Sequence, residues 1–271
     1  MSSLWAMHLP DTIARIRPHI VQISVSGPTF GENPVILGTG FLVSGLEVVT
    51  ANHVVNAATN MQSTHPHLAV GIGLPDFTDT SIFLRAGRVS IPSDVVDTYP
   101  EDDIALLKLR VDPGAEWFES TADINGTKLT VRTEPVELDA RDVKDGMAVA
   151  TSGFPLNSQA LVTTTGVVAS YWSVDTPTNP RTRILIDLTA NGGNSGGPVY
   201  DINSGAVVGV LVAGKLAPAT GATGIATAAG LTIAVPTRAI VELLSKNGIT
   251  PPMRPPAGAR TPRGRPKGAR G

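Results

Sequence analysis

Residues 184–201 read ILIDLTANGGNSGGPVYD, and the glycine-rich centre of this stretch is the most informative part of the sequence. Ser195 is followed by two glycines and, beyond Asn194, preceded by two more. Glycines allow a tight turn that exposes the serine hydroxyl and lets a second backbone approach. The same turn can direct the amides of Gly193 and Ser195 to one point, where an oxyanion would be stabilised. On its own, however, such a turn is more typical of an ordinary hairpin loop.

Short β-rich runs separated by glycine, proline, asparagine and aspartate lie on both sides of this stretch. They start at about residue 19, and examples are HIVQISV, DIALLKLRV, ALVTTTGVVASYW and LTIAV. Short strands at even intervals predict an all-β fold, either a sandwich or a barrel. Helical periodicity is best in residues 236–248, where Pro236 suits a first turn and Gly248 a C-terminal cap. A second short helix or turn is predicted directly after His53.

The composition excludes several kinds of chemistry. The 271 residues are 42% hydrophobic and 16% charged, which is enough apolar material for a core, and they include no cysteine. The absence of thiols excludes disulfides, iron–sulfur clusters, thiolate zinc sites and cysteine nucleophiles, so any nucleophile is an oxygen or an amine. His65-Pro66-His67 is better explained as a surface loop than as a metal pair. No metal and no cofactor is predicted.

The net charge of −2 is the sum of an acidic segment, residues 1–249, and a basic tail, residues 250–271. Residues 250–271 carry six basic side chains and no acid, lack apolar periodicity, and are predicted to be disordered. Within them PRGRPK is similar to the AT-hook core, in which Arg263 and Arg265 would lie in the minor groove of A/T-rich DNA. Nonspecific contact with anions and a simply solvated tail are the alternatives.

Other segments bear on the loops between strands and on the cellular location of the protein. Residues 214–230 are small and nearly uncharged and predict a long surface loop. Asn125-Gly126 is a hairpin or connector signal. Asp11 interrupts the apolar residues that a signal peptide needs, and the longest apolar run, 206–214, is too short to span a bilayer. We therefore expect a soluble, cytoplasmic protein without membrane contact.

A histidine and an aspartate accompany Ser195 in an informative order. One strand-like run closes with TANHVV and a later one opens with EDDIALLKL. The chain order His53, Asp103, Ser195 is that of the chymotrypsin arrangement and differs from the orders in subtilisins and α/β-hydrolases. Asp102 is the competing aspartate. Because neighbouring residues of a strand face opposite ways, only one of the two can meet His53.

The chain resembles the chymotrypsin-fold serine peptidases, most closely the bacterial trypsin-like HtrA (Deg) type. Five segments carry the resemblance in the family's order: GTGFLVSGLEVVTANHVV, EDDIALLKL, TSGFPLNSQALVTTTGVVAS, ILIDLTANGGNSGGPVYD and LTIAVPTRAIVELL. The resemblance implies two six-stranded antiparallel β-barrels packed together, with a C-terminal helix. The implied peptidase domain covers residues 1–249, with barrels at about 19–111 and about 128–235 and a closing helix at 236–247.

The resemblance also implies an activity, namely peptide-bond hydrolysis by a serine endopeptidase through an acyl-enzyme intermediate. His53 would be the general base, Asp103 the residue that orients it, and Ser195 the nucleophile. The amides of Gly193 and Ser195 would donate to the oxyanion. The position directly before Ile-Ala-Leu favours Asp103 over Asp102 for the aspartate.

The chain departs from the family pattern in two places. Asn194 stands where the animal digestive enzymes have an aspartate that pairs with a new amino terminus, so zymogen activation of that kind is not expected. Only 22 residues follow position 249, which is too few for the PDZ domain of the HtrA type. The peptide-sensing and cage-building functions of that type are therefore in doubt.

The sequence indicates the preferred substrate less clearly than it indicates the reaction. Thr189 should lie near the base of the primary pocket, and Val212-Ala213-Gly214 should form the strand that pairs with substrate backbone. Because position 189 carries threonine and not an acidic residue, a substrate with a small or medium apolar side chain before the cleaved bond is favoured over one with lysine or arginine. The expected partner is a peptide or protein substrate. The alternative function is a peptidase-fold binding module with an unformed oxyanion hole, tethered to nucleic acid by its tail.

Overall fold

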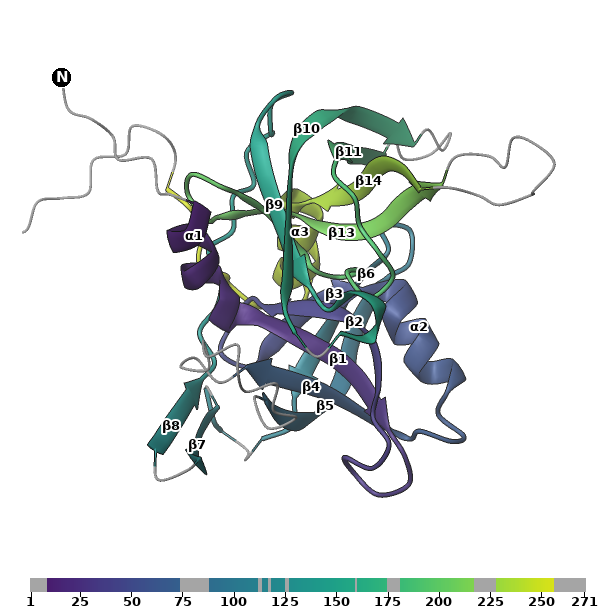
Figure 1. Cartoon of the computed structure of the whole chain (residues 1–271), viewed down its shortest axis with the longest axis vertical. Helices are drawn as coiled ribbons and strands as arrows, with labels where there is room; N and C mark the ends of the chain where they lie inside the picture. The colour runs from purple at the N-terminus through teal and green to yellow at the C-terminus, as the bar shows by residue number, and fades with distance from the viewer. Residues whose placement is uncertain are drawn as a thin grey trace, which may run out of the picture.

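The computed structural model describes residues 9–73, 88–111, 114–116, 118–124, 127–158, 160–174, 181–216 and 228–255. Most of these residues form two closed antiparallel β-barrels, stacked one on the other in Figure 1. The prediction of an all-β fold with two six-stranded barrels is confirmed, and the open choice between sandwich and barrel is settled in favour of barrels.

The first barrel contains six strands in the spatial order β1-β2-β3-β6-β5-β4. They are β1 (Ile20–Ser26), β2 (Val35–Leu42), β3 (Glu47–Ala51), β4 (His67–Gly73), β5 (Arg88–Tyr99) and β6 (Ile104–Leu109). Every residue of β1 is buried. Valine, isoleucine and leucine supply most of the interior, as the low aromatic content of the chain requires.

The second barrel has the spatial order β10-β11-β14-β13-β12-β9. Its strands are β9 (Ala148–Gly153), β10 (Val162–Val174), β11 (Arg181–Asp187), β12 (Pro198–Asp201), β13 (Val207–Leu216) and β14 (Ala228–Pro236). The long surface loop predicted at 214–230 is wrong at both ends, because β13 extends to Leu216 and β14 begins at Ala228. Residues 217–227 lie outside the described part of the chain.

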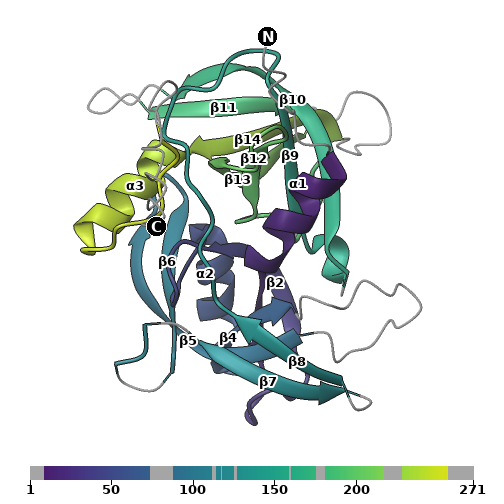
Figure 2. The ribbon, with the colours of Figure 1, turned by 90° about the vertical axis from the view of Figure 1, so that its left-hand side faces the viewer.

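The expected start of the second barrel at about 128 is wrong. β7 (Glu119–Ile124) and β8 (Thr127–Arg132) pair with each other in a separate two-stranded sheet, and the second barrel begins at Ala148. Figure 2 shows this hairpin beside the first barrel. The pairing reaches Ile124 opposite Thr127, on either side of Asn125-Gly126, which lies outside the described residues.

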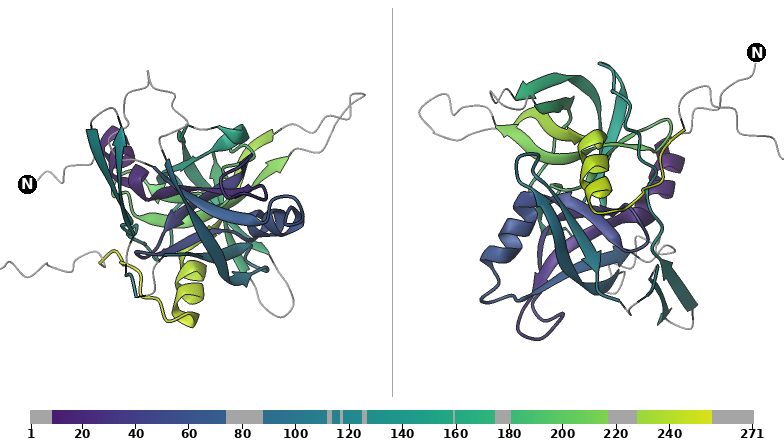
Figure 3. Two further views of the ribbon diagram at one scale, coloured as in Figure 1. Left: turned by 90° about the horizontal axis from the view of Figure 1, so that it is seen from below. Right: turned by 180° about the vertical axis from the view of Figure 1, so that it is seen from behind.

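Helices and short turns connect and cover the barrels. They are α1 (Leu9–Ile16), η1 (Arg17–His19), α2 (Asn52–Asn60), η2 (Pro155–Asn157) and α3 (Thr237–Lys246). The predicted helices after His53 and Pro236 are both present, whereas α1 was not predicted. α3 buries Ile240, Leu243 and Leu244 and packs at the junction of the barrels, as seen from behind in Figure 3.

The predicted disorder of residues 250–271 is wrong for their first part. Met253 forms a β-bridge with Leu138. The Leu138 amide donates to the Pro252 carbonyl oxygen at 2.8 Å, and the Arg254 amide donates to the Leu138 carbonyl oxygen at 2.7 Å. The chain therefore pairs with the segment around Leu138 up to residue 254, and Arg263 and Arg265 lie outside the described residues.

Candidate active site

The side chains of His53 and Asp103 contact each other directly. His53 lies in the first turn of α2, and Asp103 lies in the turn between β5 and β6. The Asp103 carboxylate accepts hydrogen bonds from Nδ1 of His53 at 2.7 Å and from the His53 amide at 2.9 Å. An ionised carboxylate only accepts, so Nδ1 carries the ring proton and Nε2 is left as the basic nitrogen.

The start of α2 explains why this contact forms. The first amides of a helix have no acceptor within it, and Ala51, directly before α2, has no side chain to cap them. Asp103 supplies both acceptors: its carboxylate accepts from His53, and its carbonyl oxygen accepts from the Asn52 amide at 3.0 Å. A carboxylate at a helix N-terminus is also favoured by the helix dipole.

Asp102 faces a different partner. Its carboxylate accepts a hydrogen bond from the Arg183 guanidinium of β11 at 2.9 Å, and the same guanidinium donates to the Glu101 carbonyl oxygen at 2.7 Å. The two aspartates diverge because they lie in a turn, where Asp103 has φ +55°, and not on a strand as the sequence argument assumed. Aspartate tolerates this left-handed backbone better than most residues.

Ser195 lies in the loop of residues 188–197 between β11 and β12, here called the serine loop. The loop turns at two left-handed glycines, Gly193 with φ +99° and Gly196 with φ +84°. A Cβ at Gly193 would lie 2.3 Å from the Phe154 carbonyl oxygen, and one at Gly196 would lie 2.2 Å from the Thr39 carbonyl oxygen. Both positions therefore require glycine for space as well as for conformation.

Hydrogen bonds fix the peptide groups on both sides of Gly193. The Leu156 amide donates to the Gly192 carbonyl oxygen at 2.7 Å, and the Thr39 hydroxyl donates to the Gly193 carbonyl oxygen at 2.7 Å. The N–H of a trans peptide points away from its carbonyl, so the Gly193 amide points away from Leu156. Among the described residues, the amides of Gly193 and Ser195 have no hydrogen-bond acceptor.

Gly38 of β2 brings the two halves of the site together. The Thr39 amide donates to the Ser195 carbonyl oxygen at 2.9 Å, which ties the serine loop to the first barrel. A Cβ at Gly38 would lie 2.9 Å from that carbonyl oxygen and 2.7 Å from the side chain of Val54, the residue after His53. Only glycine allows the serine loop and the start of α2 to approach this closely.

The Phe154 region packs against the serine loop from the second barrel. Phe154 is buried, and the Arg88 guanidinium lies 4.1 Å from the centre of its ring. Burial, together with the nearby Arg17, lowers the pKa of Arg88 to about 10. Asn194, at the position of the digestive-enzyme aspartate, is also buried, and its Oδ1 has no hydrogen-bond partner among the described residues.

The predicted substrate-binding residues lie around the serine loop. Thr189 is exposed within it. Ala213 and Gly214 of β13 pair with Ile233 and Thr232 of β14, whereas the pairing of β13 with β12 ends at Val210. Leu211 makes two more backbone hydrogen bonds, with Gly196 and Gly197 of the serine loop. Beyond Leu211, the described residues show no strand paired with that side of β13. The backbone of residues 212–214 is thus an edge that an extended peptide could join.

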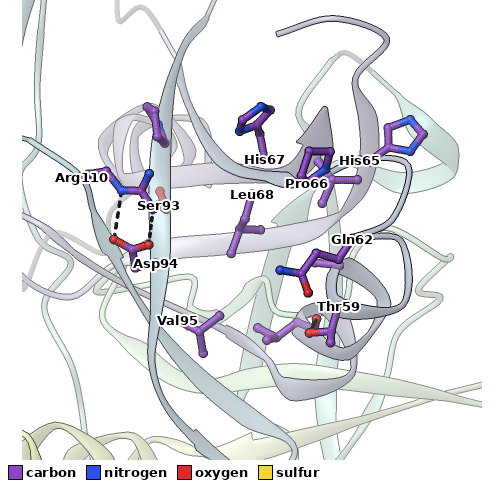
Figure 4. Close-up of a pocket in the computed structure, with 14 residues that line it drawn as sticks. Thr59, Gln62, His65, Pro66, His67, Leu68, Ser93, Asp94, Val95 and Arg110 are labelled. Atoms are coloured by element: carbon purple, nitrogen blue, oxygen red, sulfur yellow. Dashed lines mark hydrogen bonds and ion pairs between the residues drawn. The ribbon is translucent and has the colours of Figure 1, made fainter. Parts of the chain in front are cut away.

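His65 and His67 do not approach the serine loop. Nδ1 of His65 hydrogen-bonds the Thr64 hydroxyl, and Nε2 of His67 hydrogen-bonds the Pro28 carbonyl oxygen. Both histidines line a pocket of about 260 Å³ on the first barrel, shown in Figure 4, which contains none of the predicted site residues. In the described part of the chain no three His, Asp or Glu side chains are grouped to hold a metal.

The fold and this arrangement define a class, the trypsin-like peptidases. Residues 38–210 match the family described as the trypsin-like peptidase domain, and the chain belongs to that family. The resemblance seen in the sequence is confirmed. Among the described residues, no helix is long and apolar enough to cross a membrane.

Three solved structures show the same fold. The active form of the Rv3671c protease from M. tuberculosis is 22% identical, with 89% of this chain and 86% of that chain covered and a TM-score of 0.59. Its inactive form is 21% identical, with 88% and 92% covered and a TM-score of 0.56. A variant of the HtrA-type protease AlgW with a tripeptide is 18% identical, with 89% and 63% covered and a TM-score of 0.58.

Sequence reasoning missed three residues that hold the site. Thr39 and Leu156 fix the peptide groups around Gly193, and Arg183 binds the turn that carries Asp103. Thr39 and Leu156 lie inside segments that carry the family resemblance. Their contacts cross between segments distant in sequence, and no local pattern encodes them.

Proposed function

We propose that this protein is a serine endopeptidase that cleaves peptide bonds through an acyl-enzyme, with His53, Asp103 and Ser195 as its catalytic residues. The observation that carries the proposal is the pair of hydrogen bonds from the Asp103 carboxylate to the ring and the amide of His53. A histidine held in this way presents one basic nitrogen in a fixed direction. Membership of the trypsin-like peptidase family supports the same activity.

Each residue has a defined task in this mechanism. Nε2 of His53 takes the proton of the Ser195 hydroxyl as the oxygen attacks the substrate carbonyl carbon, and it returns the proton to the leaving amine. Asp103 keeps the ring tautomer and stabilises the imidazolium that forms in between. A water molecule then attacks the acyl-enzyme in the same manner and releases the free acid.

The serine loop supplies the electrostatic part of the reaction. The amides of Gly193 and Ser195 donate to the oxyanion of the tetrahedral intermediate. The carbonyl oxygens of Gly192 and Gly193 are both held by other groups, which supports a loop with its amides available. This favours the peptidase over the binding module with an unformed oxyanion hole.

The proposed substrate is an extended peptide. Its backbone pairs with the free edge of residues 212–214, and the side chain before the cleaved bond enters a pocket near Thr189. Thr189 carries no charge, so a small or medium apolar side chain fits better than lysine or arginine. A set of fluorogenic peptides that differ only at this residue measures the preference as kcat/KM.

Covalent labelling tests the nucleophile. A fluorophosphonate probe should label the wild type at one site, and Ser195→Ala should abolish labelling and lower turnover by about 10⁶-fold. Ser63→Ala is the matched control, because Ser63 is an exposed serine in the turn after α2. Labelling that persists in Ser195→Ala would show that another residue is the nucleophile. A wild type that binds peptides but is neither labelled nor active would be the binding module.

The histidine base predicts a pH dependence. The rate of hydrolysis should rise from pH 5 to pH 8, because only the neutral imidazole accepts the seryl proton. Asp103→Asn should lower kcat by about 10⁴-fold, since an amide that donates to Nδ1 favours the wrong tautomer. Asp102→Asn is the control and should retain the pH profile. A flat profile between pH 5 and pH 8 would contradict the histidine base.

A further inference from the structure

Thr39 joins the first barrel to both ends of the segment that carries the proposed oxyanion donors. It lies in β2 and is completely buried. Its hydroxyl donates to the Gly193 carbonyl oxygen at 2.7 Å and accepts from the Phe154 amide at 3.0 Å. Its own amide donates to the Ser195 carbonyl oxygen at 2.9 Å. One residue of the first barrel thus holds two residues of the serine loop and one residue next to it.

Close packing around Thr39 shows that this contact is built into the fold. A Cβ at Gly153 would lie 2.7 Å from the Thr39 hydroxyl oxygen. The Thr39 carbonyl oxygen accepts from the Thr50 hydroxyl at 2.7 Å, which anchors Thr39 to β3. Both the hydroxyl and the main chain of Thr39 are therefore fixed, and the hydroxyl both donates one hydrogen bond and accepts one.

Gly193 needs such an anchor. It has φ +99° and no side chain, so its backbone rotates more freely than that of any other residue type. The orientation of its amide depends on what holds the peptide groups on either side. The Leu156 amide holds the preceding carbonyl, and the Thr39 hydroxyl holds the following one. Without the hydroxyl, the buried Phe154 amide would lose its acceptor, and the half-buried Gly193 carbonyl oxygen would lose its donor.

We propose that the Thr39 hydroxyl is a positioning residue for the oxyanion hole, which keeps the Gly193 amide aimed at the reacting carbonyl when the barrels are docked. This inference rests on the proposed peptidase function. Buried polar groups that lose a partner seek another one or admit water, and rotation of the Gly193 peptide groups is the least costly response. The result is a loss of transition-state stabilisation without a change at His53 or in the peptide-binding edge.

Two substitutions separate the hydroxyl from the rest of the side chain. Thr39→Val keeps the branched shape and removes the hydroxyl, whereas Thr39→Ser keeps the hydroxyl and removes the methyl group. Turnover of a peptide substrate, inhibition by a peptide aldehyde, and amide hydrogen exchange of residues 190–197 are measured on the full-length chain. The aldehyde forms a tetrahedral adduct with Ser195 and so reports on the oxyanion hole independently of turnover.

Thr39→Val should lower kcat by about 10- to 100-fold, somewhat less than the loss of an entire oxyanion donor, with KM within about threefold of wild type. The aldehyde inhibition constant should rise by a similar factor. The pH profile should keep its shape, because His53 and Asp103 are untouched. Residues 190–197 should exchange faster, and Thr39→Ser should restore each value to within about threefold of wild type.

Several results would overturn the inference. Equal loss in Thr39→Val and Thr39→Ser would assign the effect to packing of the methyl group. Unchanged kcat and unchanged exchange in Thr39→Val would show that the hydroxyl does not hold the loop. If the wild type neither hydrolyses peptides nor reacts with the fluorophosphonate, the proposed function fails, and the exchange of residues 190–197 alone decides: faster exchange in Thr39→Val supports the hydroxyl anchor, and unchanged exchange refutes it.

Discussion

Asp102 and Asp103 are neighbours of the same residue type, yet they bind groups from different barrels. Asp103 binds His53 of its own barrel, whereas Asp102 binds Arg183 of the second barrel. The left-handed backbone at Asp103 turns the two carboxylates apart. The backbone conformation of Asp103 thus leaves Asp103 with a proposed chemical role and Asp102 with a structural one.

We expect His19 to make the free energy of unfolding depend on pH. Burial lowers the pKa of His19, although its hydrogen bond with the Glu134 carbonyl oxygen opposes this effect. The unfolded chain takes up a proton near the ordinary histidine pKa of about 6.5, whereas the folded chain does so at lower pH. The free energy of unfolding is therefore highest above about pH 6.5. It decreases as the pH falls, until His19 of the folded chain is protonated as well.

His19→Asn should weaken this dependence, because an amide can donate to the Glu134 carbonyl oxygen without titrating. Melting temperatures of variant and wild type, measured between pH 8 and pH 5, should diverge in slope only below about pH 6.5. Parallel curves over the whole range would show that His19 is not responsible for the acid sensitivity.

At the scale of elements, the serine loop depends on glycine at defined positions. Gly193→Ala should lower kcat by about 10²-fold or more, because the new Cβ would collide with the Phe154 carbonyl oxygen and displace the donor amide. Gly192→Ala is the matched control, since a Cβ there would have no neighbour within 4 Å. Similar kcat values for the two variants would contradict the account of the loop.

The elements also show what the sequence could and could not predict. Strands and the helix 237–246 follow from local patterns, and the motif order placed His53, Asp103 and Ser195. The β7–β8 hairpin was assigned to the second barrel because a run such as TKLTVR predicts a strand but does not predict its pairing partner. The packing of Met253 beside Leu138 was missed for the same reason, since a proline-rich segment gives no signal for a partner distant in sequence.

At the scale of the molecule, the ion pair of Arg183 and Asp102 joins the barrels. Both side chains are about nine-tenths buried. Arg183→Met removes the guanidinium from a buried carboxylate and should lower the free energy of unfolding by about 3–5 kcal/mol. The double variant with Asp102→Asn should recover much of this loss, because the buried charge is then absent as well. Denaturant unfolding of both variants measures the difference.

Arg110→Met is the surface control for this experiment. Arg110 pairs with Asp94, and both side chains are more than half exposed. An exposed ion pair contributes little, so this variant should unfold close to the wild type. Equal losses in Arg183→Met and Arg110→Met would show that the buried pair has no special role between the barrels.

The basic tail can be tested apart from the peptidase. A chain that ends at residue 255 keeps Met253 and Arg254, which contact Leu138 in the segment before the second barrel, and should cleave small peptides normally. If Arg263 and Arg265 lie in a minor groove, only the full chain should prefer A/T-rich over G/C-rich duplex, with affinity that falls as salt rises. Equal binding to both duplexes would exclude the AT-hook interpretation and leave nonspecific contact.

The division of the site between the barrels has a mechanical consequence. His53 and Asp103 belong to one barrel and Ser195 to the other, and Thr39 and Arg183 join the two barrels through hydrogen bonds. A separation of the barrels by little more than an ångström would break these links while leaving every strand ladder intact. The proposed peptidase activity would then be lost at a lower urea concentration than the β-sheet circular dichroism signal, so loss of activity would report separation of the barrels before they unfold.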